Sequence, residues 1–489
     1  MALIVASGAM TEAFCQQFNG YLASEFSGVI RLRDQPASAA MSPYKFDLNL
    51  VNGNVYLGNN IAFVTKNNEG GNSLIRYSDQ KRKFLTSNLS IGGLSALFSL
   101  SGNSGFAIQY RYRAIGNGLD ISPNLINQIN RFSNPQFFGT SYFDETINFS
   151  MAAWHELGLT YGVVLKDDDV NRWKLGITLK GINPTGHTWL NVSDVDYSID
   201  NSGNASFTSF DLAAGYSSNL DAYEYFDGTN PIDIPPVGTG FKLGAGDIGL
   251  VYEKVAYRPD PKTSIGSSFK PDLTYEYRIS ASITDIGLMN YERGSASFQS
   301  NGLNANAANT NFDLLLDSVS SFRNLRDSLS TFMNLNDASG EYTVSLPTAL
   351  RLSFDYNFGN NYFLGIAAVA DLSRLMPTDY RVNYANSITI SPRYETGYYG
   401  LYLPIFYNLS GDLNVGLAAR YGPLTLGTHA LSTLFGKEKS SVGFFFSLSL
   451  NQLKANSDKP YCFGSSRTGS ALVRTQRTPI YKRKKFIFF

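Results

Sequence analysis

The residue types that most often carry chemistry are few and scattered in this sequence. Its three histidines, His155, His187 and His429, show neither the spacing of metal ligands nor that of a catalytic triad. The run at 167–169, three aspartates, lacks the glycine and the glutamate of a calcium-binding loop, and we interpret it as a solvated turn. We therefore predict that the protein is not an enzyme and that it holds no metal and no cofactor.

One glycine motif has the spacing of a nucleotide-binding loop. Residues 244–249 match the spacing G-x-G-x-x-G of a dinucleotide-binding loop. That loop must follow a strand and open a helix. Here the motif runs into Asp247-Ile-Gly-Leu-Val-Tyr-Glu, which has the pattern of a strand, so we predict no nucleotide site.

Charged residues on one side of the predicted strands are the remaining candidates for a functional site. In the strand assignment given below, seven of them point inward: Lys174, Lys180, Glu276, Arg278, Arg351, Asp355 and Arg420. Because buried charges have to be paired, one interpretation is that they crosslink the inside of the wall. The other is that they set the selectivity of a pore.

These charges lie in segments whose hydrophobicity alternates with a period of two. In Leu350–Phe358 every even position is apolar or aromatic and every odd position is polar, which is typical of a strand with two different faces. Similar alternation occurs at 106–113, 173–180, 275–283, 413–421 and 442–450. Each segment has about nine residues, the length that a tilted strand needs to cross a membrane. Further candidate strands are 46–52, 55–63, 92–101, 156–165, 209–217, 247–255, 362–370 and 396–406, which gives about fourteen strands.

The second face of these strands distinguishes a soluble sheet from a membrane barrel. It is rich in Gly, Ser, Asn and Thr, whereas a face in bulk water would carry many Lys and Glu. Charged residues make up only 16% of the chain and aromatic residues 14%. We therefore predict an all-β fold, a closed antiparallel transmembrane β-barrel in the outer membrane; a soluble, secreted β-rich protein is the alternative. Tyr275, Tyr277, Tyr356, Phe358 and Tyr421 are expected in an interfacial aromatic girdle.

Several segments fall outside the strand pattern. Residues 1–16 resemble a signal peptide without its basic region. We expect residues 17–45, with a turn at Pro36 and Ala37, to form a plug inside the lumen, the alternative being a further membrane strand at 21–33. The barrel then spans 46–450, with a short helical insertion at 311–337 where apolar residues recur every three or four positions. Residues 451–489 form a polar and then basic tail.

Five stretches resemble known families. Arg33–Ala40 is similar to the Asn-Pro-Ala element of outer-membrane barrels of the fatty-acid-transporter-like (FadL-like) superfamily, with Gln35 in place of Asn. The segments 244–252, 277–287 and 346–351, with Phe322–Leu325, resemble a family of unknown function found in the Bacteroidota. This resemblance implies a barrel of about fourteen strands with an N-terminal plug. It also implies that some relatives belong to type IX secretion and gliding machinery.

Two functions remain open on this basis. The first is a plugged conduit for hydrophobic small molecules. The second is an accessory barrel subunit of a cell-envelope complex. The expected partners are outer-membrane lipid and either a hydrophobic small molecule or envelope proteins. Equal numbers of basic and acidic residues, 40 of each, argue against a nucleic-acid partner.

Overall fold

A computed structural model of the chain describes residues 18, 20–66, 72–77, 79–101, 103–129, 131–168, 170–223, 240–255, 275–308, 310, 311, 313, 319–409, 412–435 and 440–453. The predicted signal peptide and almost all of the predicted tail lie outside these residues. In the described part of the chain, no helix is long and apolar enough to cross a membrane.

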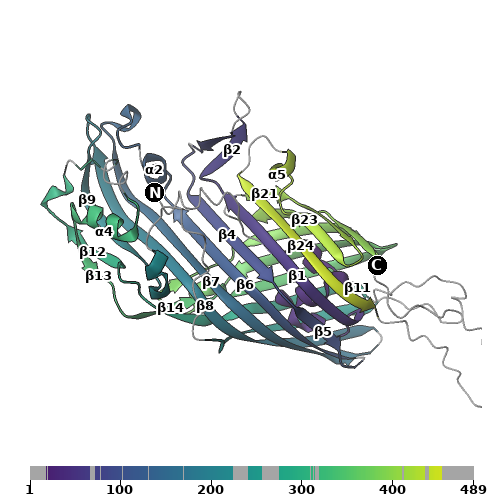
Figure 1. Cartoon of the computed structure of the whole chain (residues 1–489). Helices are drawn as coiled ribbons and strands as arrows, with labels where there is room; N and C mark the ends of the chain where they lie inside the picture. The colour runs from purple at the N-terminus through teal and green to yellow at the C-terminus, as the bar shows by residue number, and fades with distance from the viewer. Residues whose placement is uncertain are drawn as a thin grey trace, which may run out of the picture.

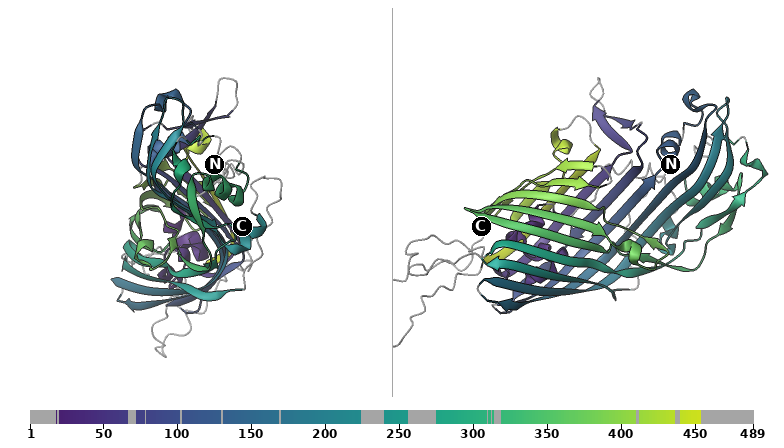
Figure 2. Two further views of the ribbon diagram at one scale, coloured as in Figure 1. Left: turned by 90° about the vertical axis from the view of Figure 1, so that its left-hand side faces the viewer. Right: turned by 180° about the vertical axis from the view of Figure 1, so that it is seen from behind.

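The strands form one closed antiparallel barrel of 14 strands (Figures 1 and 2). β24 closes the ring on β1, from the Tyr44–Leu453 pair to the Gly58–Ser441 pair. All 14 ring positions follow one another in chain order, and three of them are built from two short strands each. In ring order the strands are β1 (Tyr44–Asn59), β4 (Lys83–Gly92) with β5 (Ser95–Ser99), β6 (Ser104–Ile121), β7 (Ser141–Asp167), β8 (Asn171–Ile199), β10 (Lys242–Val255), β11 (Tyr275–Glu292), β15 (Ala349–Gly359), β16 (Tyr362–Asp371), β18 (Ser387–Glu395), β19 (Tyr399–Tyr402) with β20 (Ile405–Asn408), β21 (Asp412–Val415) with β22 (Leu417–Tyr421), β23 (Leu424–Thr428) and β24 (Ser441–Leu453).

The two faces of the wall differ in the way that the alternation predicts. Arg278 lies opposite Asp355 in the register of β11 and β15, and both side chains are buried inside the ring. Their neighbours Ile279 and Phe354 point outward and are 48% and 41% exposed. An apolar outer face and a closed ring are what a lipid bilayer demands, because no backbone group is left unpaired at an edge. The prediction of a closed antiparallel β-barrel is confirmed, and the location in the outer membrane stays a prediction.

A second, smaller unit extends the barrel at one end (Figure 1). β7 and β8 have 27 and 29 residues, far more than a membrane crossing needs. Beyond Ile182, the last partner of β10, β8 pairs with β9 (Ala205–Tyr216), and the sheet continues through β12 (Phe298–Leu303) to β13 (Met333–Asp337). With α2 (Pro123–Gln128) and α4 (Phe322–Ser330), these strands enclose an apolar core that includes Phe132, Phe207 and Phe332. We call this unit the extension.

The remaining elements are short and lie in the connections between ring strands. β2 and β3 form a hairpin of their own, and β14 pairs in parallel with β17. These elements are β2 (Ala62–Lys66), β3 (Asn72–Arg76), β14 (Glu341–Ser345), β17 (Tyr380–Arg381), α5 (Ser432–Phe435), η4 (Pro135–Phe137), η5 (Ser218–Tyr223), η7 (Ala305–Ala307) and η8 (Ser373–Leu375).

The structure corrects several predicted boundaries. The candidate strands at 46–52 and 55–63 are one continuous strand, β1, up to Asn59. The candidate at 209–217 is β9, which belongs to the extension and not to the ring. The helix expected over 311–337 is confined, among the described residues there, mainly to α4, because Met333–Asp337 pairs with β12 as a strand. Tyr275 was expected in the outer girdle, but its side chain is buried inside the barrel.

The N-terminal segment, which we define as the described residues of 18–40, folds into three short 3-10 turns: η1 (Tyr21–Ala23), η2 (Glu25–Arg33) and η3 (Pro36–Ala39). Ser24 caps the second turn through the Phe26 N–H, and Pro36 occupies the first position of the third. η2 contacts β1 and β5, whereas η3 contacts β6, β7, β8 and β10 on another part of the wall. The segment therefore lies within the ring, and the alternative of a membrane strand at 21–33 is wrong.

Candidate functional site: the charged lumen

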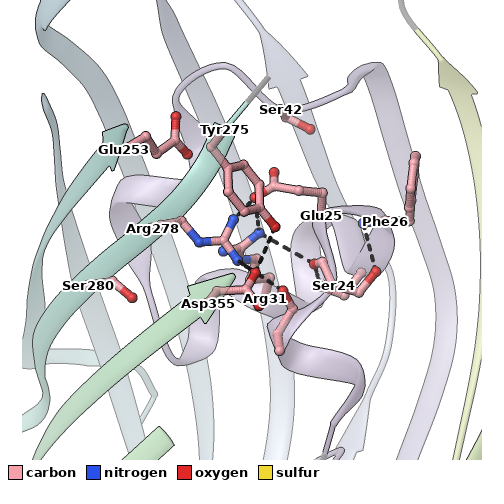
Figure 3. Close-up of polar contacts among 12 residues, drawn as sticks. Ser24, Glu25, Phe26, Arg31, Ser42, Glu253, Tyr275, Arg278, Ser280 and Asp355 are labelled. Atoms are coloured by element: carbon pink, nitrogen blue, oxygen red, sulfur yellow. Dashed lines mark hydrogen bonds and ion pairs between the residues drawn. The ribbon is translucent and has the colours of Figure 1, made fainter. Parts of the chain in front are cut away.

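Ion pairs join the N-terminal segment to the wall of the barrel (Figure 3). The guanidinium of Arg278 contacts Glu25 of the segment on one side and Asp355 of β15, at 2.9 Å, on the other. Asp355 also binds Arg393 of β18 and accepts a hydrogen bond from the Tyr275 hydroxyl at 2.6 Å. One carboxylate thus connects three strands, and through Arg278 it reaches the segment.

Two further contacts hold the segment from other directions. Asp34 pairs with Arg351 of β15 at 3.2 Å. The Gln35 side-chain amide donates to the carbonyl oxygens of Ala281, at 3.1 Å, and Leu250, at 3.3 Å, in two neighbouring strands. The segment is therefore attached to β10, β11 and β15 by polar contacts that a purely apolar filling would lack.

Glycines of the wall allow the turn at Pro36 and Ala37 to lie directly against it. A Cβ at Gly176 would overlap the backbone of both residues, and a Cβ at Gly249 would overlap Gln35. Gly249 is the last glycine of the G-x-G-x-x-G motif, so part of that motif permits a close approach of backbone within the barrel.

A second, fully buried group of charges lies on the inner face of β6, β7, β8, β10 and β11. Lys180 contacts Asp247 and Asp285, each at 2.6 Å. Arg113 binds Glu156 at 3.0 Å and Asp285 at 2.8 Å. With Arg111, the group has three cations and three carboxylates. Equal numbers of opposite charges, all within contact distance, are the condition under which a buried charge is tolerated.

A third group lies on β8 and β10 and at the end of β7. Lys174 and Arg172 both contact Glu253, at 2.7 Å and 3.2 Å. Arg172 also reaches Asp167 at 3.0 Å. The three groups together bridge most of the strands from β6 to β18.

A cavity of about 140 Å³ remains between the N-terminal segment and the wall. Its charged lining comes from Arg31 and Asp34 of the segment and from Arg278, Arg351 and Asp355 of the wall. Serines of β11 and β15 and the small side chains of β16 complete it. The cavity has room for a few water molecules or one small molecule.

An aromatic layer lies where the ring passes into the extension. We define it as Trp154, Trp189, Tyr291, Tyr342 and His187, whose rings pack with centroid distances such as 4.9 Å between Trp189 and Tyr342. Here Ser150 lies 3.1 Å from Nε2 of His187, but Nδ1 of that ring faces the Tyr342 hydroxyl and not a carboxylate. Among the described residues, His187 has no acid of the kind that orients and stabilises a catalytic histidine.

The sequence-predicted residues have different environments. Lys174, Lys180, Arg278, Arg351 and Asp355 lie inside the ring, and each takes part in an ion pair. Arg420 is buried too, but it donates to the backbone oxygens of Thr396 and Gly397 and covers the ring of Phe26 at 4.8 Å.

Glu276 does not join the others. Its side chain is exposed at the beginning of β11, and no ion pair is described for it. The register between β10 and β11 shifts at this point, so the inward position is taken by Tyr275. Strict alternation fails wherever a bulge adds a residue to one strand.

Sequence reasoning missed several of the most connected charges: Arg111, Arg113, Glu156, Asp285, Arg393 and Glu395. A signal existed for Arg111 and Arg113, which occupy the polar positions of the alternating run 106–113. Asp285 has a positive φ of 59° within β11, which the alternation gave no means of foreseeing.

Comparison with known proteins gives the family of the chain. Residues 36–429 match the model of DUF5723, a family of unknown function. The chain belongs to the DUF5723 family. This agrees with the predicted resemblance to a family of unknown function, whereas an origin in the Bacteroidota stays a prediction. No curated protein matches this DUF5723 chain.

Solved structures similar to the DUF5723 chain include a channel and a transporter. A mutant of the monoaromatic hydrocarbon channel TodX is 12% identical, with a TM-score of 0.39, over 91% of this chain and 98% of that one. A Pseudomonas aeruginosa FadL homologue is 10% identical, with a TM-score of 0.38, over 89% and 95%. The Ralstonia pickettii toluene transporter TbuX is 9% identical, with a TM-score of 0.38, over 86% and 92%. These are likenesses of shape only.

Proposed function

We propose that this DUF5723 protein is an outer-membrane conduit whose lumen is closed by its N-terminal segment. The contact of Arg278 with both Glu25 and Asp355 carries the proposal, because it fastens the segment across the interior of the ring. A barrel of about fourteen strands is wider than its own side chains can fill. The segment, the ion pairs and the aromatic layer occupy that width, so passage requires the segment to move.

The cargo we propose is a hydrophobic small molecule. The aromatic layer supports this choice, since Trp154 and Trp189 leave their indole N–H groups unpartnered among the described residues. The ring of Trp189 packs against Tyr342, and the guanidinium of Arg113 covers the ring of Trp154. Such a surface binds an apolar molecule through its rings and orients a polar substituent through the free N–H groups.

The conduit is tested by weakening the attachment of the segment. Asp34→Asn together with Glu25→Gln removes both carboxylates of the segment that bind the wall, while leaving the barrel strands unchanged. We expect higher conductance in a planar bilayer and faster entry of a small aromatic hydrocarbon into proteoliposomes. The matched control is Asp200→Asn, whose carboxylate accepts from the N–H groups of Ser202 and Asn204 in a turn of the extension, and for which neither quantity should change. Unchanged conductance and entry in the double variant would contradict the conduit.

A second function, the accessory subunit of an envelope complex, is favoured by a separate observation. The extension has its own apolar core and continues the sheet beyond the ring, which a simple pore does not need. We propose that it would serve as the binding platform of such a subunit. Affinity purification from gently solubilised membranes tests this: stoichiometric envelope proteins that are lost on replacing the extension by a short turn support it, and recovery of the barrel alone contradicts it.

A further inference from the structure

One cation of the N-terminal segment differs from the other buried cations of the lumen, which have carboxylates or, in Arg420, backbone oxygens as partners. Arg33 is only 5% exposed, yet it forms no ion pair with any described carboxylate. Its Nε and Nη1 atoms are buried without a hydrogen-bond partner among the described residues. Its guanidinium carbon lies 5.7 Å from the centroid of the Phe18 ring. An unpaired charge in such a place is costly.

The charges around Arg33 are already neutralised by one another. Asp34 forms an ion pair with Arg351, and Glu156 forms ion pairs with Arg111 and Arg113. Burial lowers the pKa of the Arg33 guanidinium to about 9, so the side chain stays charged at neutral pH. One positive charge is therefore left over in this part of the lumen.

The wall that faces Arg33 has unused hydrogen-bonding groups as well. Asn52 and Asn54 of β1 and Ser90 of β4 are fully buried on the inner face, with Asn54 directly opposite Ser90. The Oδ1 atom of Asn52, the Nδ2 atom of Asn54 and the Oγ atom of Ser90 lack partners in the described structure. Asn88, two residues before Ser90 on β4, also has no partner for either polar atom in the described structure. We call these side chains of β1 and β4 the polar row.

Arg33 approaches this row at a glycine. A Cβ built on Gly92, which lies opposite Asn52, would come 2.7 Å from Nη2 of Arg33. The same Cβ would overlap the Asn52 side chain. The guanidinium and the polar row thus meet at one place between the segment and the β1–β4 wall.

We propose that Arg33, with Asn54 and Ser90, forms a binding site for a small oxyanion, the chemistry shared by phosphate, sulfate and carboxylate. Donors predominate: two guanidinium N–H groups, one amide and one hydroxyl. An oxyanion accepts from all of them and neutralises the remaining charge, and a planar guanidinium is well suited to bind it through two hydrogen bonds. The site is distinct from the aromatic layer and does not depend on conduction.

The test is anion binding to the purified full-length protein in detergent. Sodium phosphate, sodium sulfate and sodium acetate are titrated at constant ionic strength, with chloride as the balancing anion, and the unfolding temperature and the heat of binding are recorded. We expect a saturable rise in unfolding temperature with at least one of the three oxyanions. If none of the three oxyanions raises the unfolding temperature more than chloride does, the proposal of this site is wrong.

Variants of Arg33 separate a binding site from a structural role. Arg33→Gln removes the charge, and we expect affinity for the anion to fall by at least about tenfold. Because the same change removes an unpaired buried cation, the anion-free protein should become more stable. Arg33→Lys keeps the charge and should retain binding. A structural role predicts the opposite: Arg33→Gln would lower the unfolding temperature without anion and leave the effect of phosphate intact.

The matched control is another buried cation of the lumen. Lys174→Gln removes a charge that Glu253 already neutralises, and Glu253 keeps Arg172 as its partner. The variant should bind phosphate like the unaltered protein. If Lys174→Gln and Arg33→Gln weaken binding equally, the effect comes from the overall charge of the lumen, and the assignment to Arg33 is overturned.

Discussion

Arg393 places its two terminal nitrogens on the two carboxylate oxygens of Asp355, each at 2.7 Å. Both side chains are almost completely buried, and Asp355 receives Arg278 and Tyr275 in addition. Paired guanidinium and carboxylate groups with parallel hydrogen bonds are among the strongest polar contacts in proteins. Asp355 is therefore the centre of the junction between the wall and the N-terminal segment.

Loss of this carboxylate should destabilise the barrel strongly. Asp355→Asn keeps the shape but leaves Arg393 and Arg278 with a neutral partner in a buried place. We expect the free energy of unfolding to fall by about 3–5 kcal/mol, since breaking a buried pair leaves uncompensated charge. Unfolding in urea, followed by tryptophan fluorescence, measures it. The control, Asp337→Asn, breaks the pair of exposed Asp337 with Arg326, and should cost less than about 1 kcal/mol. Equal losses in the two variants would contradict the role of Asp355.

The sequence predicted the wall well because one face of each strand meets lipid. In β15, Leu352 and Phe354 alternate with Ser353 and Asp355, and this alternation survives into the structure as outward and inward side chains. The prediction failed where polar residues fit either a turn or the lumen face of a strand. Asn52-Gly53-Asn54 has the composition of a turn, yet it continues β1, since its asparagines face the lumen.

The partners of the lumen charges lay beyond the reach of the sequence. The contact of Arg113 with Asp285 joins residues 172 positions apart, and it depends on the order of strands around the ring. The extension was missed for a related reason: β8 carries one strand pattern throughout, but its first half pairs with β10 and its second half with β9. Local alternation reports which face a residue occupies and says nothing about which strand lies beside it.

A charge on the outer face should oppose insertion into the membrane. Phe354→Arg places a guanidinium among lipid tails, at an expected cost of about 2–4 kcal/mol if the site lies near the middle of the bilayer. Folding into vesicles, followed by the shift in electrophoretic mobility of the folded barrel, measures this cost. Phe143→Arg, at an exposed position of the extension outside the ring, is the control and should fold normally. Normal folding of both variants would place β15 outside the lipid.

The extension should unfold separately from the ring. The ring of Phe207 lies 5.4 Å from that of Phe332 and 5.2 Å from that of Phe210. Phe207→Ala empties part of this core, which typically costs about 3–5 kcal/mol. We expect faster amide hydrogen exchange in β9 and β12 and unchanged exchange in β15 and β16, because the two units have different cores. Faster exchange throughout the chain would show instead that ring and extension unfold together.

Gly28 should be required for the N-terminal segment to keep its place. The residue has φ 58° and ψ −133°, a conformation that strains any other residue by about 1–3 kcal/mol. A Cβ there would also overlap the carboxylate of Asp47, which accepts the Val29 N–H at 2.7 Å. We expect Gly28→Ala to detach the segment from β1, seen as faster proteolysis within residues 18–40 and higher conductance. Gly240→Ala is the control, because Gly240 also has a positive φ of 103° but no atom within 4 Å of its Cβ position. If Gly28→Ala resists protease as well as Gly240→Ala does, the contact with Asp47 does not hold the segment.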